Sequence, residues 1–204
     1  MGIKVINRSI PFPLFRECDK MMMKRNIIIT KTIENIPFVF NIIPQAILIP
    51  YLCNMKFYLD TSVWGGYFDD EFKEWTVPFI NQIKEGLCLG VLSNITLGEL
   101  EEAPLKVRNL VKSIPEEFLE FVNITEEQEI LAEKYISKGA LTRKYVSDAQ
   151  HIAISTVLKV DSLASWNFRH MVNFFRIKQY NGINLMNGYS IIDIRTPKEL
   201  LLRK

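Results

Sequence analysis

Short apolar runs alternate with longer segments of helical periodicity along most of this chain, and this alternation constrains the fold more than any other feature. Five runs are short enough for strands: 56–59, 87–92, 118–124, 160–165 and the more polar 190–194. Apolar runs of this length suit strands that are buried on both faces. Strands that alternate with helices favour a parallel sheet covered on both sides. The sequence therefore predicts a three-layer α/β/α sandwich with a mostly parallel sheet of about five strands.

The first apolar run ends abruptly on an acidic residue. Residues 56–59 are followed directly by Asp60, Thr61 and Ser62. Functional side chains of open α/β sheets gather at the carboxyl ends of the strands, so Asp60 is expected at the mouth of a site. An Asp in this position is also a common N-cap of the next helix. Taken alone, Asp60 leaves both roles open.

Two further acids fall near predicted helix starts. Thr96 and Glu99 have capping-box spacing, which would place Glu99 in a first helical turn after a strand. Residues 147–150 have the same spacing and place Asp148 in a first turn, where the helix dipole favours the carboxylate anion. Residues 125–128 form a third capping box, which opens a helix that looks structural. Capping and dipole complementation are the alternative roles of Glu99 and Asp148.

The predicted fold can gather Asp60, Glu99 and Asp148 at one sheet edge. Three carboxylates within a few ångströms repel one another unless a cation lies among them. Mg²⁺ or Mn²⁺ suits oxygen ligands, and the presence of only two histidines also directs metal chemistry toward carboxylates. Such ions lower the pKa of a bound water and clamp a phosphodiester. These residues therefore predict metal-dependent phosphodiester hydrolysis.

The segments around these acids resemble motifs of the PIN-domain nucleases, and more narrowly of the VapC-like toxins. The resemblance covers about residues 55–203. Four motifs carry it, which are Tyr58-Leu59-Asp60-Thr61-Ser62, Leu97-Gly98-Glu99-Leu100, Ser147-Asp148-Ala149-Gln150-His151-Ile152-Ala153 and Ser165-Trp166-Asn167-Phe168-Arg169-His170. Each motif alone is weak, but their order and intervals together are fairly specific.

The resemblance implies a five-stranded parallel sheet and a site for Mg²⁺ or Mn²⁺ formed by Asp60, Glu99 and Asp148. It also implies endoribonuclease activity, as in the toxin of a type II toxin-antitoxin pair, and a supporting hydrogen bond from Ser62. Many members carry a further Asp near the position of Asn167. The neutral amide can coordinate through its carbonyl or position a water, but it weakens a second metal site.

Two basic residues that follow Asn167 are candidate ligands of phosphate. Arg169 and His170 could contact phosphate, although a structural role for His170 is an equal alternative. RNA is the implied substrate, and a small antitoxin bound near the acids and a second copy of the chain are the implied partners. The acidic middle of the chain and its basic ends are either solvated faces or a means of steering a polyanion.

Two other functions compete with the nuclease. A catalytically silent PIN-like domain would bind RNA or a protein; the three acids argue against it, and Asn167 argues for it. A phosphatase of the haloacid dehalogenase type needs a second Asp two residues after the first, where this chain has Ser62. Neither phosphate-loop motif, GxxxxGK[ST] nor GxGxxG, is present.

Residues 1–54 differ in character from the rest. Their apolar stretch is broken by Pro37, Pro44 and Pro50, which argues against a membrane helix, and they lack the order of a signal peptide. We expect a poorly ordered or non-native extension over residues 1–54, a nuclease domain over residues 55–204, and no stable membrane association. Three cysteines without a CxxC pair suit the cytoplasm.

Overall fold

The protein has a five-stranded sheet in which every strand pair is parallel. The computed structural model describes residues 55–201. The strands are β1 (Lys56–Leu59), β2 (Leu89–Ser93), β3 (Leu119–Val122), β4 (Ser162–Ala164) and β5 (Ile194–Arg195). They are ordered β3-β2-β1-β4-β5. The predicted parallel α/β sheet is therefore confirmed.

The winding of the sheet reverses at its central strand. The chain passes from β1 to β2 and β3 on one side, and later to β4 and β5 on the other. A reversal of this kind leaves a crevice at the carboxyl ends of the strands, which is where open α/β proteins place their ligands. The carboxyl ends of β1, β2 and β4 are therefore the natural place for a site.

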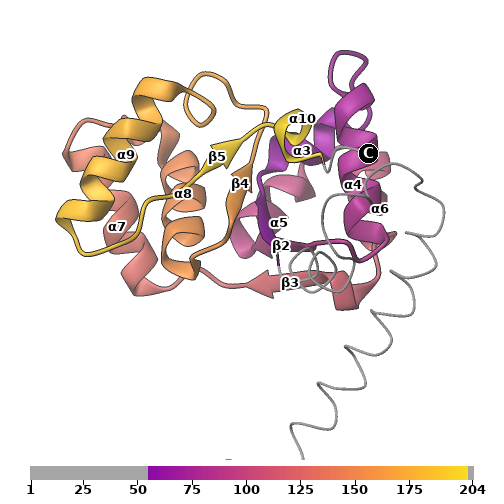
Figure 1. Cartoon of the computed structure of the whole chain (residues 1–204), viewed down its shortest axis with the longest axis horizontal. Helices are drawn as coiled ribbons and strands as arrows, with labels where there is room; N and C mark the ends of the chain where they lie inside the picture. The colour runs from indigo at the N-terminus through magenta and orange to yellow at the C-terminus, as the bar shows by residue number, and fades with distance from the viewer. Residues whose placement is uncertain (1–54, 202–204) are drawn as a thin grey trace, which may run out of the picture.

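Helices cover both faces of the sheet (Figure 1). One group consists of α7 (Glu126–Ser137), α8 (Val146–Leu158) and α9 (Phe174–Met186); the other consists of α3 (Thr61–Gly66), α4 (Lys73–Lys84), α6 (Leu105–Lys112) and α10 (Pro197–Leu200). Helix α5 (Asn94–Glu101) follows β2, and short 3₁₀ helices precede β3 (Glu116–Phe118) and α8 (Arg143–Tyr145). The architecture is the three-layer sandwich that the sequence predicted.

The central strand supplies side chains to both cores. Tyr58 packs in the cluster formed with α7, α8 and α9, whereas Phe57 and Leu59 pack in the cluster formed with α3, α4 and α6. Successive side chains of a strand point to opposite faces, so one short strand joins the two cores. This burial fixes the position of Asp60, the next residue.

Two predicted helix starts are wrong. Helix α5 begins at Asn94 because Ser93 is its N-cap, with Ser93 Oγ accepting from the Thr96 N–H at 3.3 Å. Glu99 therefore lies in the second turn of α5 and not in a first turn. Helix α8 continues directly from a 3₁₀ turn, so no Ser147 capping box opens it, although Asp148 does lie in its first turn.

The expected extension over residues 1–54 falls outside the described part of the chain. None of the helices between residues 55 and 201 is long and apolar enough to cross a membrane.

Candidate active site

Asp60 lies at the carboxyl end of β1 with only 5% of its surface exposed. Its N–H donates to the Ala164 carbonyl at 3.1 Å, which ties it to β4. Its Oδ2 atom accepts from Ser62 Oγ at 2.5 Å and from Ser165 Oγ at 2.8 Å. Its Oδ1 atom lies 3.7 Å from His151 Nε2. One carboxylate oxygen is thus held by hydroxyls, while the other faces the imidazole of His151.

Glu99 reaches the same place from α5. Its Oε2 atom accepts from Thr61 Oγ1 and lies 3.1 Å from His151 Nε2. Burial alone would favour the neutral acid, but hydrogen bonding and charge from His151, together with hydrogen bonds from Thr61 and Ser147, lower the pKa of Glu99 to about 2. Glu99 is therefore an anion at neutral pH.

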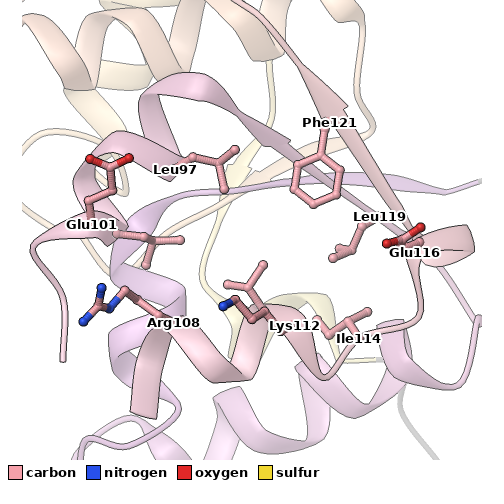
Figure 2. A pocket seen from close by; sticks show the side chains of 10 residues that line it. Leu97, Glu101, Arg108, Lys112, Ile114, Glu116, Leu119 and Phe121 are labelled. Atoms are coloured by element: carbon pink, nitrogen blue, oxygen red, sulfur yellow. The ribbon is translucent and has the colours of Figure 1, made fainter. Parts of the chain in front are cut away.

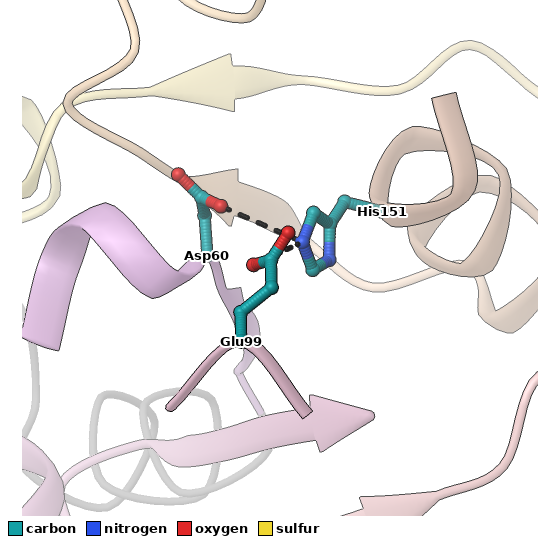
Figure 3. A group of neighbouring side chains, drawn as sticks. All are labelled: Asp60, Glu99 and His151. Atoms are coloured by element: carbon teal, nitrogen blue, oxygen red, sulfur yellow. Dashed lines mark hydrogen bonds and ion pairs between the residues drawn. The ribbon is translucent and has the colours of Figure 1, made fainter. Parts of the chain in front are cut away.

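His151 lies beside the two acids, with its Nε2 atom directed at both (Figure 3). It is 1% exposed and extends from α8. Burial alone would lower the pKa of its imidazole, but Tyr58, Glu99 and Asp60 raise it above the ordinary value. The sequence motif included His151 without a role. The sequence feature that could have identified His151 as a site residue is its spacing of three residues from Asp148, which puts both side chains on one helix face.

These three side chains have the composition and spacing of a metal site. One donor atom each from Asp60, Glu99 and His151 can be chosen so that all lie within 4.8 Å of one another. Two ligand atoms on opposite sides of an ion such as Mg²⁺ are about 4.2 Å apart. Small side-chain rotations would therefore bring the three donor atoms to binding distance of one ion. The donor set therefore fits a divalent metal.

Asp148 is beside this compact set and not part of it. A chain of hydrogen bonds connects it to Asp60: Asn167 Nδ2 donates to Asp148 Oδ1 at 3.3 Å, Asn167 N–H donates to Ser165 Oγ at 2.9 Å, and Ser165 Oγ donates to Asp60. Burial and the charge of Asp60 raise the pKa of Asp148 to about 6. The lowering expected from the helix dipole is therefore outweighed by its surroundings.

The supporting residues Ser62, Arg169 and His170 differ in burial and in hydrogen-bond partners. Ser62 accepts from the Trp166 N–H at 2.9 Å while it donates to Asp60. Arg169 is exposed, with its guanidinium carbon 5.9 Å from the centre of the Tyr145 ring. His170 is buried against the Tyr145 ring, with the two ring centres 3.8 Å apart. Neither ring nitrogen of His170 has a hydrogen-bond partner within residues 55–201. Arg169 is thus the one of the two expected phosphate contacts that faces solvent.

A separate cavity of about 490 Å³ lies between α5, α6 and β3 (Figure 2). Its apolar lining residues are Leu97, Leu100, Val111, Ile114, Leu119 and Phe121. Two acids and two bases, Glu101, Glu116, Arg108 and Lys112, also line it. The acids of the candidate site do not line this cavity, so it is separate from that site.

The chain has distant structural neighbours. No family model and no curated protein matches its sequence. VapC20 of Mycobacterium tuberculosis, a toxin that cleaves the sarcin-ricin loop, is 15% identical with a TM-score of 0.43, over 56% of this chain and 92% of that chain. VapBC2 from Rickettsia felis, bound to a DNA fragment from its promoter, is 13% identical with a TM-score of 0.46, over 70% and 98%.

Both names belong to the VapC-like group. At these identities and TM-scores the likeness carries no weight for the chemistry of this chain, which is inferred from its own residues.

Proposed function

We propose that this protein is a divalent-metal-dependent endoribonuclease of the VapC-like type. Asp60, Glu99 and Asp148 are the catalytic and metal-binding residues of this proposal, and Mg²⁺ or Mn²⁺ is the cofactor. The observation that carries it is the gathering of donor atoms at the central strand ends, with Asp60 and Glu99 converging on the buried imidazole of His151. The pKa of Glu99 is lowered and the pKa of Asp148 is raised, and perturbed pKa values within one cluster are typical of functional sites.

The side chains around the acids hold them in place for this task. Ser62 and Ser165 fix one oxygen of Asp60, so the other remains directed at His151. Asn167 donates to Asp148 and accepts from the His170 N–H at 3.0 Å, so its amide is held at both ends and positions Asp148. A bound Mg²⁺ or Mn²⁺ would supply Lewis-acid stabilisation of the phosphodiester and a water of lowered pKa.

RNA is the proposed substrate, and exposed Arg169 is a proposed phosphate contact near the site. A small antitoxin and a second copy of the chain are the proposed partners, and the cytoplasm is the proposed compartment. The apolar cavity beside α5 adjoins the helix that carries Glu99, so a protein segment bound there would lie close to the acids.

The competing function is a catalytically silent domain that binds RNA or a protein. Its one supporting feature is the amide of Asn167 at the position where a further acid is common in the resembled family. A silent domain would not need a buried carboxylate held by two hydroxyls beside a second anion. Metal-dependent cleavage separates the two functions.

The test is cleavage of RNA by the full-length protein in Mn²⁺, with Asp60→Asn and Asp148→Asn variants purified in parallel. Each substitution removes a carboxylate from the site, and the transition-state stabilisation that a metal supplies is worth several kcal/mol. We expect cleavage to fall about a hundredfold or more. Circular dichroism should show that both variants remain folded.

Asp70→Asn is the matched control, because Asp70 is an exposed aspartate that pairs with Lys73 on the surface. This variant should cleave like the wild type. Undiminished cleavage by Asp60→Asn or Asp148→Asn would refute the assignment and would point to a contaminating nuclease.

A further inference from the structure

We propose that His151 is a direct ligand of the metal ion bound by Asp60 and Glu99, which makes the site a mixed nitrogen and oxygen site. The proposal rests on the proposed function for the presence of a metal, and it adds a ligand outside the acidic set. It follows that the site favours first-row transition ions over Mg²⁺.

The position of the imidazole supports this role. His151 Nε2 lies 3.1 Å from Glu99 Oε2 and 3.7 Å from Asp60 Oδ1. The imidazole is almost fully buried, and its Nε2 end is directed at the two carboxylates (Figure 3). A metal ion placed between the two acids would therefore have Nε2 within reach without a movement of α8.

The other ring nitrogen has the support that metal-bound histidines normally have. Nδ1 lies 2.7 Å from the Tyr58 hydroxyl, which lies 2.6 Å from Ser93 Oγ. Ser93 Oγ accepts from the Thr96 N–H and can accept a second hydrogen bond. Nδ1–H can therefore donate to Tyr58, and Tyr58 O–H to Ser93. When a metal ion replaces the proton on Nε2, this assignment leaves the Nε2 lone pair free to bind it, and hydrogen bonds from the second ring nitrogen fix the orientation of ligating histidines.

The donor set determines which ions the site prefers. Imidazole nitrogen is a good ligand for first-row transition ions, whereas Mg²⁺ selects oxygen ligands and keeps several of its waters. A site with two carboxylates and one imidazole should therefore bind Mn²⁺ more tightly than Mg²⁺. A site made only of Asp60, Glu99 and Asp148 would have no nitrogen to contribute to this preference.

Pulsed electron paramagnetic resonance of Mn²⁺ bound to the tag-free, full-length protein tests the proposal. Nitrogen coordinated to Mn²⁺ produces a ¹⁴N modulation, and the chain has only two histidines, His151 and His170. We expect imidazole ¹⁴N modulation in the wild type and in the His170→Gln control, and its loss in His151→Gln. The Mn²⁺ affinity of His151→Gln should fall by about tenfold or more, and its Mg²⁺ affinity should fall less.

The experiment distinguishes failure of the His151 assignment from failure of the proposed function. Bound Mn²⁺ without imidazole coupling in the wild type overturns the role of His151 and leaves the carboxylate site of the proposed function intact. Coupling that persists in His151→Gln also overturns it. Absence of Mn²⁺ binding in the wild type overturns both the ligand assignment and the metal dependence. The wild-type spectrum already decides against the proposal if it lacks coupling, so that outcome does not depend on whether a variant folds.

Discussion

The hydroxyl of Ser62 helps to stabilise the buried carboxylate of Asp60. It donates to Asp60 Oδ2 and accepts from the Trp166 N–H, and so it joins the end of β1 to the segment that follows β4. Ser165 supplies the second hydroxyl to the same oxygen. Burying an anion is unfavourable unless hydrogen bonds replace its water. These serines therefore contribute to the fold as well as to the proposed site.

Ser62→Ala should lower the free energy of unfolding by about 1–3 kcal/mol, because the variant removes a donor to Asp60 and leaves the Trp166 N–H without its acceptor. The measurement is urea unfolding in the presence of a chelator. Ser137→Ala is the control, since exposed Ser137 donates its hydroxyl hydrogen bond to the Lys134 carbonyl of its own helix. Equal stability of the two variants would show that the hydrogen bonds of Ser62 contribute nothing to the fold.

Helix α8 connects the site to one of the two cores. It carries Asp148 in its first turn and His151 three residues later, while Ile152, Ala153 and Ile154 pack into the core that includes α7. The position of α8 therefore depends on how well its neighbour is formed. Helix α7 begins with the predicted capping box, in which Thr125 and Gln128 bond each other's backbone.

Thr125→Ala should destabilise the protein by about 1 kcal/mol, because the variant leaves the Gln128 N–H at the start of α7 without its acceptor. Thr142→Ala is a matched control: Thr142 is also an exposed N-cap threonine, but its side chain makes no capping hydrogen bond. Its stability should remain close to that of the wild type. Thermal or urea unfolding of both variants measures the difference, and equal losses would contradict the capping explanation.

The proposed site draws its donors from three parts of the molecule. Asp60 comes from the end of β1, Glu99 from α5, and His151 and Asp148 from α8. A site assembled in this way exists only when the whole domain is folded. An ion that binds it is therefore a ligand of the native state and must raise the free energy of unfolding.

Mn²⁺ at ten times its dissociation constant should stabilise the full-length protein by about 1.4 kcal/mol, which corresponds to a rise in melting temperature of about 3–6 °C. Asp148→Asn should show a smaller rise, and Asp70→Asn a rise like that of the wild type. Differential scanning fluorimetry at increasing Mn²⁺ concentration measures these shifts. A wild type that does not respond would favour the silent binding domain, unless added uncleavable RNA restored the response.

Local patterns in the sequence were enough to predict the parallel sheet, the place of Asp60 at the end of β1, the first-turn position of Asp148 and the capping box at Thr125. Strand length, helix period and caps are set by neighbours within a few residues, and the alternation of strands with helices favours parallel pairing. The helix starts at Asn94 and Val146 were missed because several residues could cap each helix, and the surrounding strand and 3₁₀ turn decided between them.

Only the tertiary structure placed His151 beside the two acids and Ser165 beside Asp60. Tyr58 and His151 are 93 residues apart in the chain, and Asp60 and Ser165 are 105 apart. Whether a polar side chain is buried, and which partner satisfies it, depends on strand order and on the packing of α8 against the sheet. A sequence specifies these contacts only through the complete fold, because hydrogen bonds between distant segments form only after the core has brought those segments together.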